Sequence, residues 1–136
     1  MSVLISFISI AVLTAVDQVI KFVVERYLQP IGSVEFINGF IGWNYVRNTG
    51  AAFGSFSQST TLLSIVTGIV ILAGIVLIAT KKIKSKFYLT CAVMVISGGL
   101  GNLIDRVLKG YVVDFIEVQF TDFAVFNFAD ILVTVG

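Results

Sequence analysis

Residues 60–80 read TTLLSIVTGIVILAGIVLIAT, without a charged side chain, and are followed at once by KKIKSK at residues 81–86. An apolar helix of ~20 residues rises ~30 Å, which is the thickness of the hydrocarbon core of a bilayer. Lysine and arginine gather in the loops on the cytoplasmic side of a membrane protein. These two segments therefore predict a membrane-spanning helix that ends at the cytoplasmic face.

Three further apolar stretches lie on either side of this one. Residues 3–24, interrupted only by Asp17 and Lys21, and residues 87–108 are each long enough to cross a bilayer. Residues 126–136 reach only ~15 Å as a helix, half the thickness of a membrane. The alternatives are a sequence that stops inside a fourth span and a protein that ends in a half-helix, and we expect the first. A cleaved signal peptide is the alternative for the first stretch, but no Lys or Arg precedes it and no small-x-small cleavage site comes before Asp17. We predict an all-α polytopic membrane protein with four transmembrane helices, the fourth truncated.

The composition also indicates a membrane protein. Hydrophobic residues make up 57% of the chain and charged residues 12%, and the mean hydropathy is +1.02. These values lie far outside those of soluble globular proteins. The net charge of +1 gives no reason to expect a nucleic-acid partner, and a single cysteine excludes an intramolecular disulfide. We expect one domain over residues 1–136, surrounded by membrane lipids, without a metal or cofactor.

The lysines set the orientation of the chain in the membrane. If residues 81–86 are cytoplasmic, the N-terminus is cytoplasmic as well, and residues 25–59 and 109–125 lie outside. Asp17 and Asn102 then both sit ~21 to 23 Å above the inner side, and Asp130 descends to meet them from the outer side. The topology therefore predicts a cluster of polar side chains near the outer leaflet.

The outer segment between the first two spans has the pattern of a small β-sheet. Apolar and aromatic residues at 34–37 and 40–46 flank Asn38-Gly39, which favours a type I′ hairpin turn with positive φ at both turn positions. The aromatic rings of this hairpin, residues 34–46, suit the headgroup level of a bilayer. A loop that only connects the two spans is the alternative.

Several polar side chains interrupt the apolar segments. Asp17 and Lys21 are four residues apart, so they can pair on one helix face. Asn102, Asp105 and Arg106 follow a glycine-rich stretch, Gly98-Gly99-Leu100-Gly101, that permits close helix packing. The alternatives are a tolerated buried ion pair for the first set and a solvated helix end for the second. Because ionisable groups inside a membrane are expensive, we expect both sets to belong to a functional site.

Two aspartates stand out in apolar surroundings. Asp114 lies in the β-like run 111–118, on a face that is otherwise apolar, where an exposed edge position is the alternative. Asp130 lies three residues after Asn127, which is the spacing of a helix capping box. Capping and a functional role are compatible, so we predict that the two carboxyl groups meet at the outer side of the membrane.

The absence of histidine narrows the chemistry. Ser-His-Asp, Cys-His and HExxH sites all require an imidazole. A Ser-Lys dyad built on Lys21 stays open, although Ser55, Ser57 and Ser59 have no distinguishing context. Two close aspartates cannot both ionise easily, so one retains a proton and the pair can supply both an acid and a base. The sequence thus favours aspartic peptidase chemistry.

Five motifs follow one another along residues 17–130. They are Asp17-Gln18-x-x-Lys21, Asn48-Thr49-Gly50-Ala51-Ala52-Phe53, Gly98-Gly99-Leu100-Gly101-Asn102 ahead of Asp105-Arg106, Gly110-x-Val112-Val113-Asp114-Phe115 and Phe126-Asn127-x-Ala129-Asp130. Their content and order resemble those of the bacterial lipoprotein signal peptidases, also called signal peptidase II. The resemblance covers nearly the whole chain, although members of that family complete the fourth span.

The resemblance implies a monomeric four-span aspartic endopeptidase of the bacterial cytoplasmic (inner) membrane, with its active site on the extracytoplasmic side. Its substrate would be a lipid-modified prolipoprotein, cleaved just before a cysteine that carries diacylglycerol. The implied roles fall into three groups. They are a catalytic dyad, Asp114 and Asp130; residues that bind substrate or support the site, Asn48, Asn102, Arg106 and Asn127; and structural polar residues, Asp17, Lys21 and Asp105.

Two other functions remain open on the sequence. In a small proton- or cation-coupled membrane carrier, Asp17, Lys21, Asp105 and Arg106 would form a polar pathway. That function requires acids throughout the bilayer, whereas we place none in the inner half. In a structural membrane subunit, the acids would serve only for capping and pairing.

Overall fold

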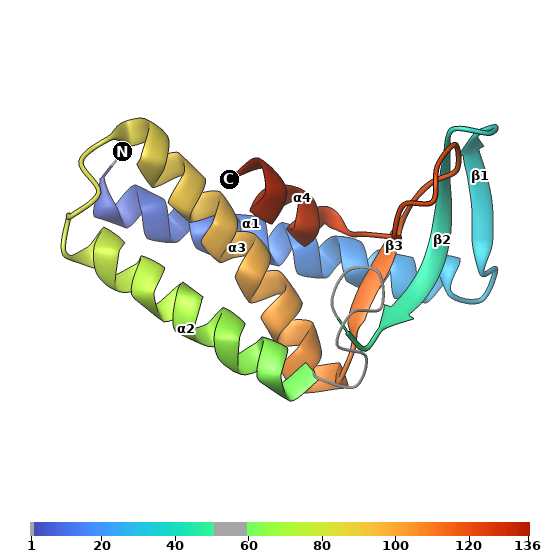
Figure 1. Ribbon diagram of the computed structural model, residues 1–136, viewed down its shortest axis with the longest axis horizontal. Helices are drawn as coiled ribbons and strands as arrows, with labels where there is room; N and C mark the ends of the chain where they lie inside the picture. The colour runs from blue at the N-terminus through green and yellow to red at the C-terminus, as the bar shows by residue number, and fades with distance from the viewer. Residues whose placement is uncertain (1, 51–59) are drawn as a thin grey trace.

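The structure, a computed structural model, describes residues 2–50 and 60–136. Its helices and strands are, in chain order, α1 (Val3–Val23), the π-helical turn η1 (Val24–Leu28), β1 (Ser33–Ile37), β2 (Ile41–Asn48), α2 (Thr60–Ala79), α3 (Lys86–Lys109), β3 (Val112–Val118) and α4 (Phe128–Val135). The three long helices run lengthwise, and the strands gather beyond one end of them (Figure 1). The N-terminus and the α2–α3 connection lie together at the opposite end.

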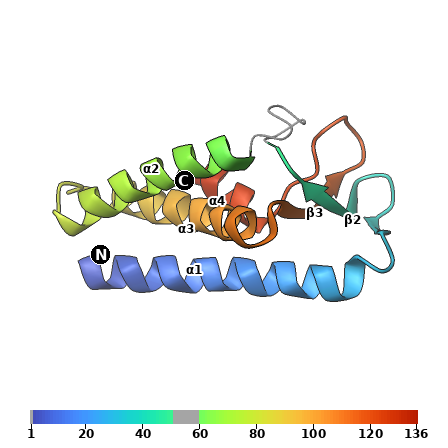
Figure 2. The same ribbon diagram turned by 90° about the horizontal axis from the view of Figure 1, so that it is seen from below.

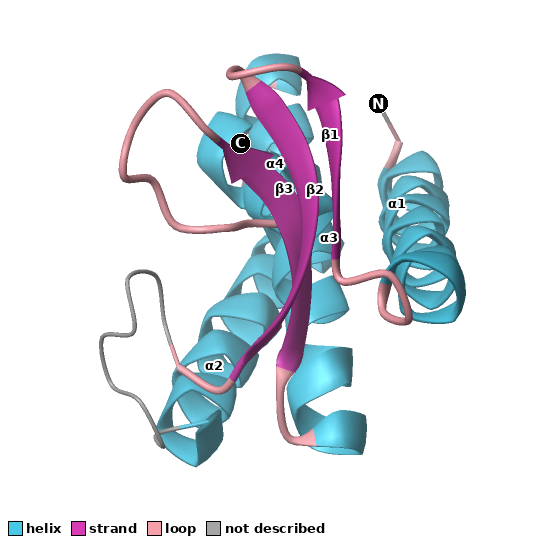
Figure 3. Cartoon of the chain, turned by 90° about the vertical axis from the view of Figure 1, so that its right-hand side faces the viewer, coloured by secondary structure: helices cyan, strands magenta, loops and turns pink. Residues whose placement is uncertain are grey.

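The strands form one antiparallel sheet in the order β1-β2-β3. The hairpin predicted at residues 34–46 is therefore present, and the β-like run around Asp114 adds a third strand to it. Seen from the sheet end, β2 crosses in front of the helices between its two neighbours (Figure 3). The aromatic side chains of the hairpin stay exposed, Phe36 by 64% and Phe40 by 58%. The sheet thus extends the helical body with an apolar surface.

The predicted type I′ turn in this hairpin is wrong. Among the described residues outside glycine, only Lys81 has a positive φ, so Asn38 does not adopt the conformation that a type I′ turn requires. Gly39 alone in this turn has a positive φ, +72°, and Phe40 N donates to Ile37 O at 2.8 Å. Positive φ at the third position is the pattern of a type II turn. The connection between β1 and β2 has three residues, 38–40, and the pairing of the two strands shifts in register between Glu35 and Ile37.

Helix α3 lies at the centre of the helical body and contacts α1, α2 and α4 (Figure 2). The buried core lies between α1, α2 and α3. It consists of Ile10, Ile71, Ile78, Leu89, Val93 and Ile96. Helix α2 buries only Ile71 and Ile78 and leaves apolar side chains exposed on its other sides. An apolar helix with such an exposed surface is suited to contact with lipid rather than water.

Three helices in the described residues are long and apolar enough to cross a membrane, and they begin at Val3, Thr60 and Lys86. The apolar end of the chain forms α4, whose eight residues rise about 12 Å. This helix packs against α3. The structure is therefore a largely helical membrane protein with a small sheet, and α4 does not reach across a bilayer within the described chain.

Gly98 allows α4 to approach α3 closely. A Cβ atom at this position would collide with the backbone oxygen of Ala129 and would meet Val133 Cγ2 at 2.9 Å. A Cβ atom at Gly101 would collide in the same way with the carboxylate of Asp17. The predicted role of these glycines in close packing is confirmed, since any side chain here would separate the helices that carry the polar residues.

Gly98→Ala is expected to lower the free energy of unfolding by about 2 kcal/mol, because the added methyl group must push α4 away from α3. Gly68→Ala, in α2, is the matched control, since nothing lies within 4 Å of a Cβ atom there. It should leave stability unchanged or raise it slightly, because alanine is the better helix former. Thermal unfolding in detergent micelles compares the two. Equal melting temperatures for both variants would contradict the proposed close contact.

Candidate active site

Asp114 is fixed by pairing between β2 and β3. Val46 lies opposite Asp114 and Asn48 opposite Val112, so the side chains of Asn48 and Asp114 are diagonal neighbours on one face of the sheet. Asn48 Nδ2 donates to Asp114 Oδ2 at 2.9 Å. Asp114 is only 2% exposed, which rules out the alternative of an exposed edge residue. The pairing of β2 with β3 therefore buries the carboxyl group of Asp114 and places the amide donor of Asn48 beside it.

Asn127 begins α4 and also contacts Asp114. The predicted capping box is confirmed: Asp130 N donates to Asn127 Oδ1 at 2.9 Å, and Asn127 N donates to Asp130 Oδ2 at 3.0 Å. The preceding residue, Phe126, forms a β-bridge with Ile116, which holds the start of α4 beside β3. From there Asn127 Nδ2 donates to Asp114 Oδ1 at 2.7 Å. Asn127 therefore both caps α4 and binds Asp114.

Asn102, on α3, completes the connection between the two aspartates. Its Nδ2 donates to Asp130 Oδ1 at 2.7 Å, and its Oδ1 accepts from Asn127 Nδ2 at 3.1 Å. Asp114 and Asp130 are therefore joined through the side-chain amides of Asn127 and Asn102. Residues far apart in the sequence meet here, as the topology predicts.

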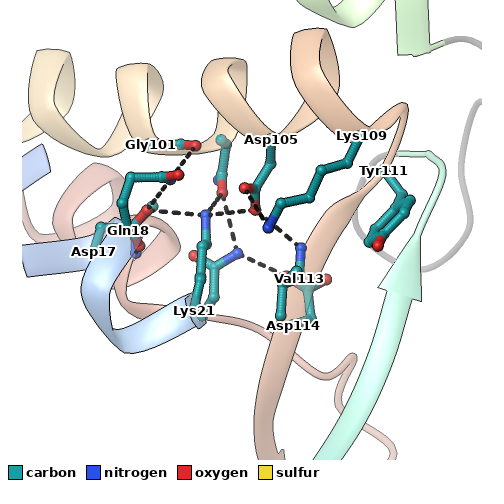
Figure 4. A network of polar contacts seen from close by, with 12 residues as sticks. Asp17, Gln18, Lys21, Gly101, Asp105, Lys109, Tyr111, Val113 and Asp114 are labelled. Atoms are coloured by element: carbon teal, nitrogen blue, oxygen red, sulfur yellow. Dashed lines mark hydrogen bonds and ion pairs between the residues drawn. The ribbon is translucent and has the colours of Figure 1, made fainter. Parts of the chain in front are cut away.

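Lys21 is the centre of a buried ionic cluster with Asp17 and Asp105 (Figure 4). Its Nζ lies 3.0 Å from Asp17 Oδ2 and 3.2 Å from Asp105 Oδ2, and it donates to Asn102 Oδ1 at 2.8 Å. The side chains of Lys21, Asp17 and Asp105 have no exposed surface. Because Asp105 is buried, a solvated helix end is no longer an explanation for it.

The two acids of this cluster also bind backbone. Asp17 Oδ1 accepts from Ala129 N at 3.1 Å, and Asp105 Oδ2 accepts from Val113 N at 3.1 Å. The residues next to Asp130 and Asp114 are thereby anchored to α1 and α3. The structural role expected for Asp17 and Asp105 has this geometric basis.

The two aspartates line the same cavity, which has a volume of about 430 Å³. Asn48, Asn102, Arg106 and Thr134 contribute the other polar side chains, and the remaining lining residues are apolar. A smaller cavity of about 270 Å³ shares Asn102, Arg106 and Asp130 and runs against α2. The mostly apolar lining of both cavities favours an apolar ligand group beside the few polar side chains.

Comparison with known proteins identifies the family. The family described as Signal peptidase (SPase) II matches residues 9–136. The chain belongs to the signal peptidase II family. A lipoprotein signal peptidase of Caldanaerobacter subterraneus subsp. tengcongensis is 41% identical over 96% of this chain and 89% of its own. One of Streptococcus agalactiae serotype Ia is 37% identical over 91% of this chain and 80% of its own.

Solved structures agree with this family assignment. A bacterial membrane enzyme determined by the in meso method at 2.3 Å resolution has a TM-score of 0.85 at 34% identity. The match covers 96% of this chain and 80% of that one. Signal peptidase II is a peptidase family, so the resemblance read from the five motifs is confirmed, and the chain is a membrane-embedded peptidase.

In this member of the signal peptidase II family, burial raises the pKa of Asp114 to about 6. The negative charge of Asp130 adds to the increase, whereas the hydrogen bonds from Asn48 and Asn127 favour the charged form and oppose it. The pKa of Asp114 therefore lies in the range where a carboxyl group can hold a proton and release it.

Arg106 has a hydrogen-bond donor that no acceptor among the described residues contacts. Its Nη2 lies 3.5 Å from Gly50 O, and its Nε is buried and has no hydrogen-bond partner among residues 2–50 and 60–136. A buried guanidinium N–H beside a cavity favours an acceptor brought by a ligand. In the described part of the chain, no group of His, Cys, Asp and Glu could hold a metal ion.

One polar residue of the site, Gln18, was not predicted from the sequence. Gln18 Nε2 donates to Gly101 O at 3.1 Å and to Asp17 Oδ2 at 3.2 Å, and its only signal was its place in the first motif. The structure does not favour the alternative of a Ser-Lys dyad built on Lys21, because the Nζ of Lys21 already contacts three acceptors. Ser55, Ser57 and Ser59, like Ala51-Ala52-Phe53 of the second motif, lie outside the described residues.

Proposed function

We propose that this chain is an aspartic endopeptidase that removes the signal peptide from prolipoproteins whose cysteine already carries diacylglycerol. Asp114 and Asp130 are its catalytic dyad. One observation carries the proposal: both carboxyl groups line one cavity and are joined through the amides of Asn127 and Asn102. Two acids held in one partly desolvated site can divide the roles of acid and base between them.

Asp130 acts as the base and Asp114 as the acid in this proposal. Asp130 takes a proton from a water molecule, whose oxygen attacks the carbonyl carbon before the modified cysteine. Asp114, with its raised pKa, donates its proton to the carbonyl oxygen. The carbon–nitrogen bond of the resulting diol then breaks. Asp130 returns its proton to the leaving amine, and a hydroxyl proton of the diol restores Asp114.

Arg106, Asn48 and the two bridging asparagines hold the reacting groups in place. The Nε of Arg106, which has no hydrogen-bond partner among the described residues, is available to a carbonyl group of the substrate peptide. Asn48 and Asn127 hold both oxygens of Asp114, so that the carboxyl cannot rotate away from the cavity. Such fixed orientation is a large part of catalysis, because it is established before the substrate arrives.

We place the site at the outer face of the bacterial cytoplasmic membrane and the enzyme there as a monomer. The α2–α3 connection, which contains the lysines of residues 81–86, lies at the end of the molecule opposite the sheet (Figure 1). Lysine-rich loops are retained inside, so the sheet faces outward. Helix α4 then enters the bilayer from the outer side as the start of a fourth span. The acyl chains of the substrate would lie in the outer leaflet, at the level of the cavity.

The lipid on the substrate supplies a test of this function. A precursor carrying diacylglyceryl-cysteine should be cleaved at least about 100-fold more efficiently, in kcat/KM, than the same precursor without the lipid. Acyl chains of this size provide binding energy remote from the scissile bond, which can position the peptide. Mass spectrometry of the products from purified enzyme in micelles measures both rates. Equal cleavage of the two precursors would refute the assigned substrate, although not the dyad.

The pH dependence of cleavage tests the role of Asp114 as acid. Because its pKa is raised to about 6, the proton is present below that pH and lost above it, so kcat/KM should fall about tenfold per pH unit on the alkaline side. Asn48→Ala removes a hydrogen bond that favours the charged form, so it should move this limb to higher pH. An unchanged limb, or one moved to lower pH, would contradict the assignment.

A further inference from the structure

A third cavity lies at the other end of the molecule, far from the aspartates. It has a volume of about 570 Å³ and is formed by residues 2–4 at the start of α1, the end of α2 and the α2–α3 connection. Both ribbon views show the N-terminus beside that connection. Lys81 and Lys84 provide the basic lining, and Ile78 and Leu89 provide part of the apolar lining.

The lysines at this cavity have no acidic partner among residues 2–50 and 60–136. The sequence contains no Asp or Glu between residues 36 and 104 and none before Asp17. No ion pair in residues 2–50 and 60–136 includes Lys81, Lys82, Lys84 or Lys86. Such a concentration of unpaired positive charge attracts an anion from the surroundings.

The cavity is also amphipathic. Its lining also includes Leu4, which is 69% exposed, and Ile83, which is half-buried, so apolar side-chain surface is accessible in the same cavity as the lysines. Accessible apolar side chains and lysines in one cavity match a lipid that has both acyl chains and an anionic headgroup.

Lys81 occupies a position that would ordinarily favour glycine. Its φ is +56°, in the left-handed region, and Lys81 N and Lys82 N donate to Ile78 O and Leu77 O as the helix ends. Glycine usually ends a helix in this conformation, since side chains make it unfavourable. The chain nevertheless holds a lysine there, at the wall of the cavity.

We propose that this cavity is a binding site for an anionic glycerophospholipid of the inner leaflet, with Lys81 and Lys84 contacting its phosphate. Basic pockets between helices on the cytoplasmic side of membrane proteins bind such headgroups. The site shares with the proposed function only the placement of this end of the molecule in the cytoplasmic leaflet, so it stands or falls independently of peptidase activity.

The test compares two double variants with the same change in charge. Lys81→Gln/Lys84→Gln removes the lysines that line the cavity, and Lys82→Gln/Lys86→Gln removes two neighbours that do not. The full chain is purified in neutral detergent, where membrane orientation plays no part. Native mass spectrometry then measures the dissociation constants for dioleoyl phosphatidylglycerol, dioleoyl phosphatidylcholine and soluble glycerol 1-phosphate, and thermal unfolding without added lipid confirms that each variant is folded.

The cavity variant should bind phosphatidylglycerol about 20- to 30-fold more weakly than the unmodified chain, whereas the control variant should lose less than about threefold. The unmodified chain should prefer phosphatidylglycerol to phosphatidylcholine and should not bind glycerol 1-phosphate measurably. Equal losses in the two variants would overturn the proposal, because the lysines would then act only as a diffuse charge. Binding of glycerol 1-phosphate as tight as that of the lipid would overturn it too, since the site would then be one for a soluble phosphate.

Discussion

Asp114→Asn and Asp130→Asn are each expected to lower kcat for cleavage of a lipidated precursor by at least about 1,000-fold. Asparagine has the shape of aspartate but can neither donate the carboxyl proton nor accept one from water. Each variant keeps one acceptor and loses the other. An amide oxygen at residue 130 can still accept from Asn127 N, as the carboxylate does at 3.0 Å, but the amide nitrogen then faces Asn102 Nδ2, which donates to the carboxylate at 2.7 Å. Product formation by purified enzyme, followed by mass spectrometry, gives the rates.

Asp122→Asn is the matched control for these two variants. Asp122 is exposed and lies outside the cavity that holds the dyad, so the same exchange of carboxylate for amide should leave kcat within about twofold. All three variants should accumulate in the membrane at the level of the unmodified chain. Near-normal cleavage by either dyad variant, with the protein properly folded, would remove the basis for the aspartic mechanism.

Lys21→Met is expected to lower the free energy of unfolding by about 3 to 5 kcal/mol. Methionine fills a similar volume but leaves Asp17 and Asp105 fully buried without the ammonium group that lies 3.0 and 3.2 Å from them. It also removes the donor to Asn102 Oδ1. Asp105 keeps Lys109 Nζ 3.2 Å from its Oδ1, so Asp17 is the acid that loses its ion pair. A buried charge without its partner costs far more than the pair contributed. Chemical denaturation in mixed micelles measures the difference.

Two further variants show whether the charge of Lys21 is responsible. Lys86→Met makes the same replacement at an exposed lysine and should change stability by less than about 0.5 kcal/mol. Asp17→Asn/Lys21→Met/Asp105→Asn removes all three charges together and should recover a large part of the loss, because neutral groups tolerate burial better. A Lys21→Met protein as stable as the original would show that the cluster is not held by its ionic contacts.

The helices and the meeting of polar residues were predictable because both depend on length and sidedness. A span of fixed rise, together with the lysines at residues 81–86, places Asp17 and Asn102 at one depth, and the structure joins them through Lys21. The capping box of Asn127 and Asp130 was predictable for a similar reason, since it depends on a spacing of three residues within one helix turn.

What the sequence could not predict depends on three-dimensional register. The contact of Asp105 with Val113 N requires the path of the chain from α3 into β3, and no periodicity specifies that path. The turn at Asn38-Gly39 was mispredicted because the dipeptide fits two turn types, and the strand register selected the one with a single positive φ. That Arg106 Nε has no hydrogen-bond partner in the described part of the chain can be seen only once the surrounding helices and strands are in place.

The side chain of Asn127 makes both the hydrogen bond that caps α4 and a hydrogen bond to Asp114. Formation of the first turn of α4 and alignment of the two aspartates are therefore one equilibrium. The side chain that supplies the first acceptor of α4 is also the one that holds Asp114, and its partner in the capping box is the other member of the proposed dyad. If α4 unwinds from its first turn, the two carboxyl groups lose their common frame at the same moment. The rate of cleavage per total enzyme should therefore be proportional to the fraction of molecules in which the first turn of α4 is helical. Partial unfolding of this turn should lower the number of active molecules and leave kcat of each active molecule unchanged.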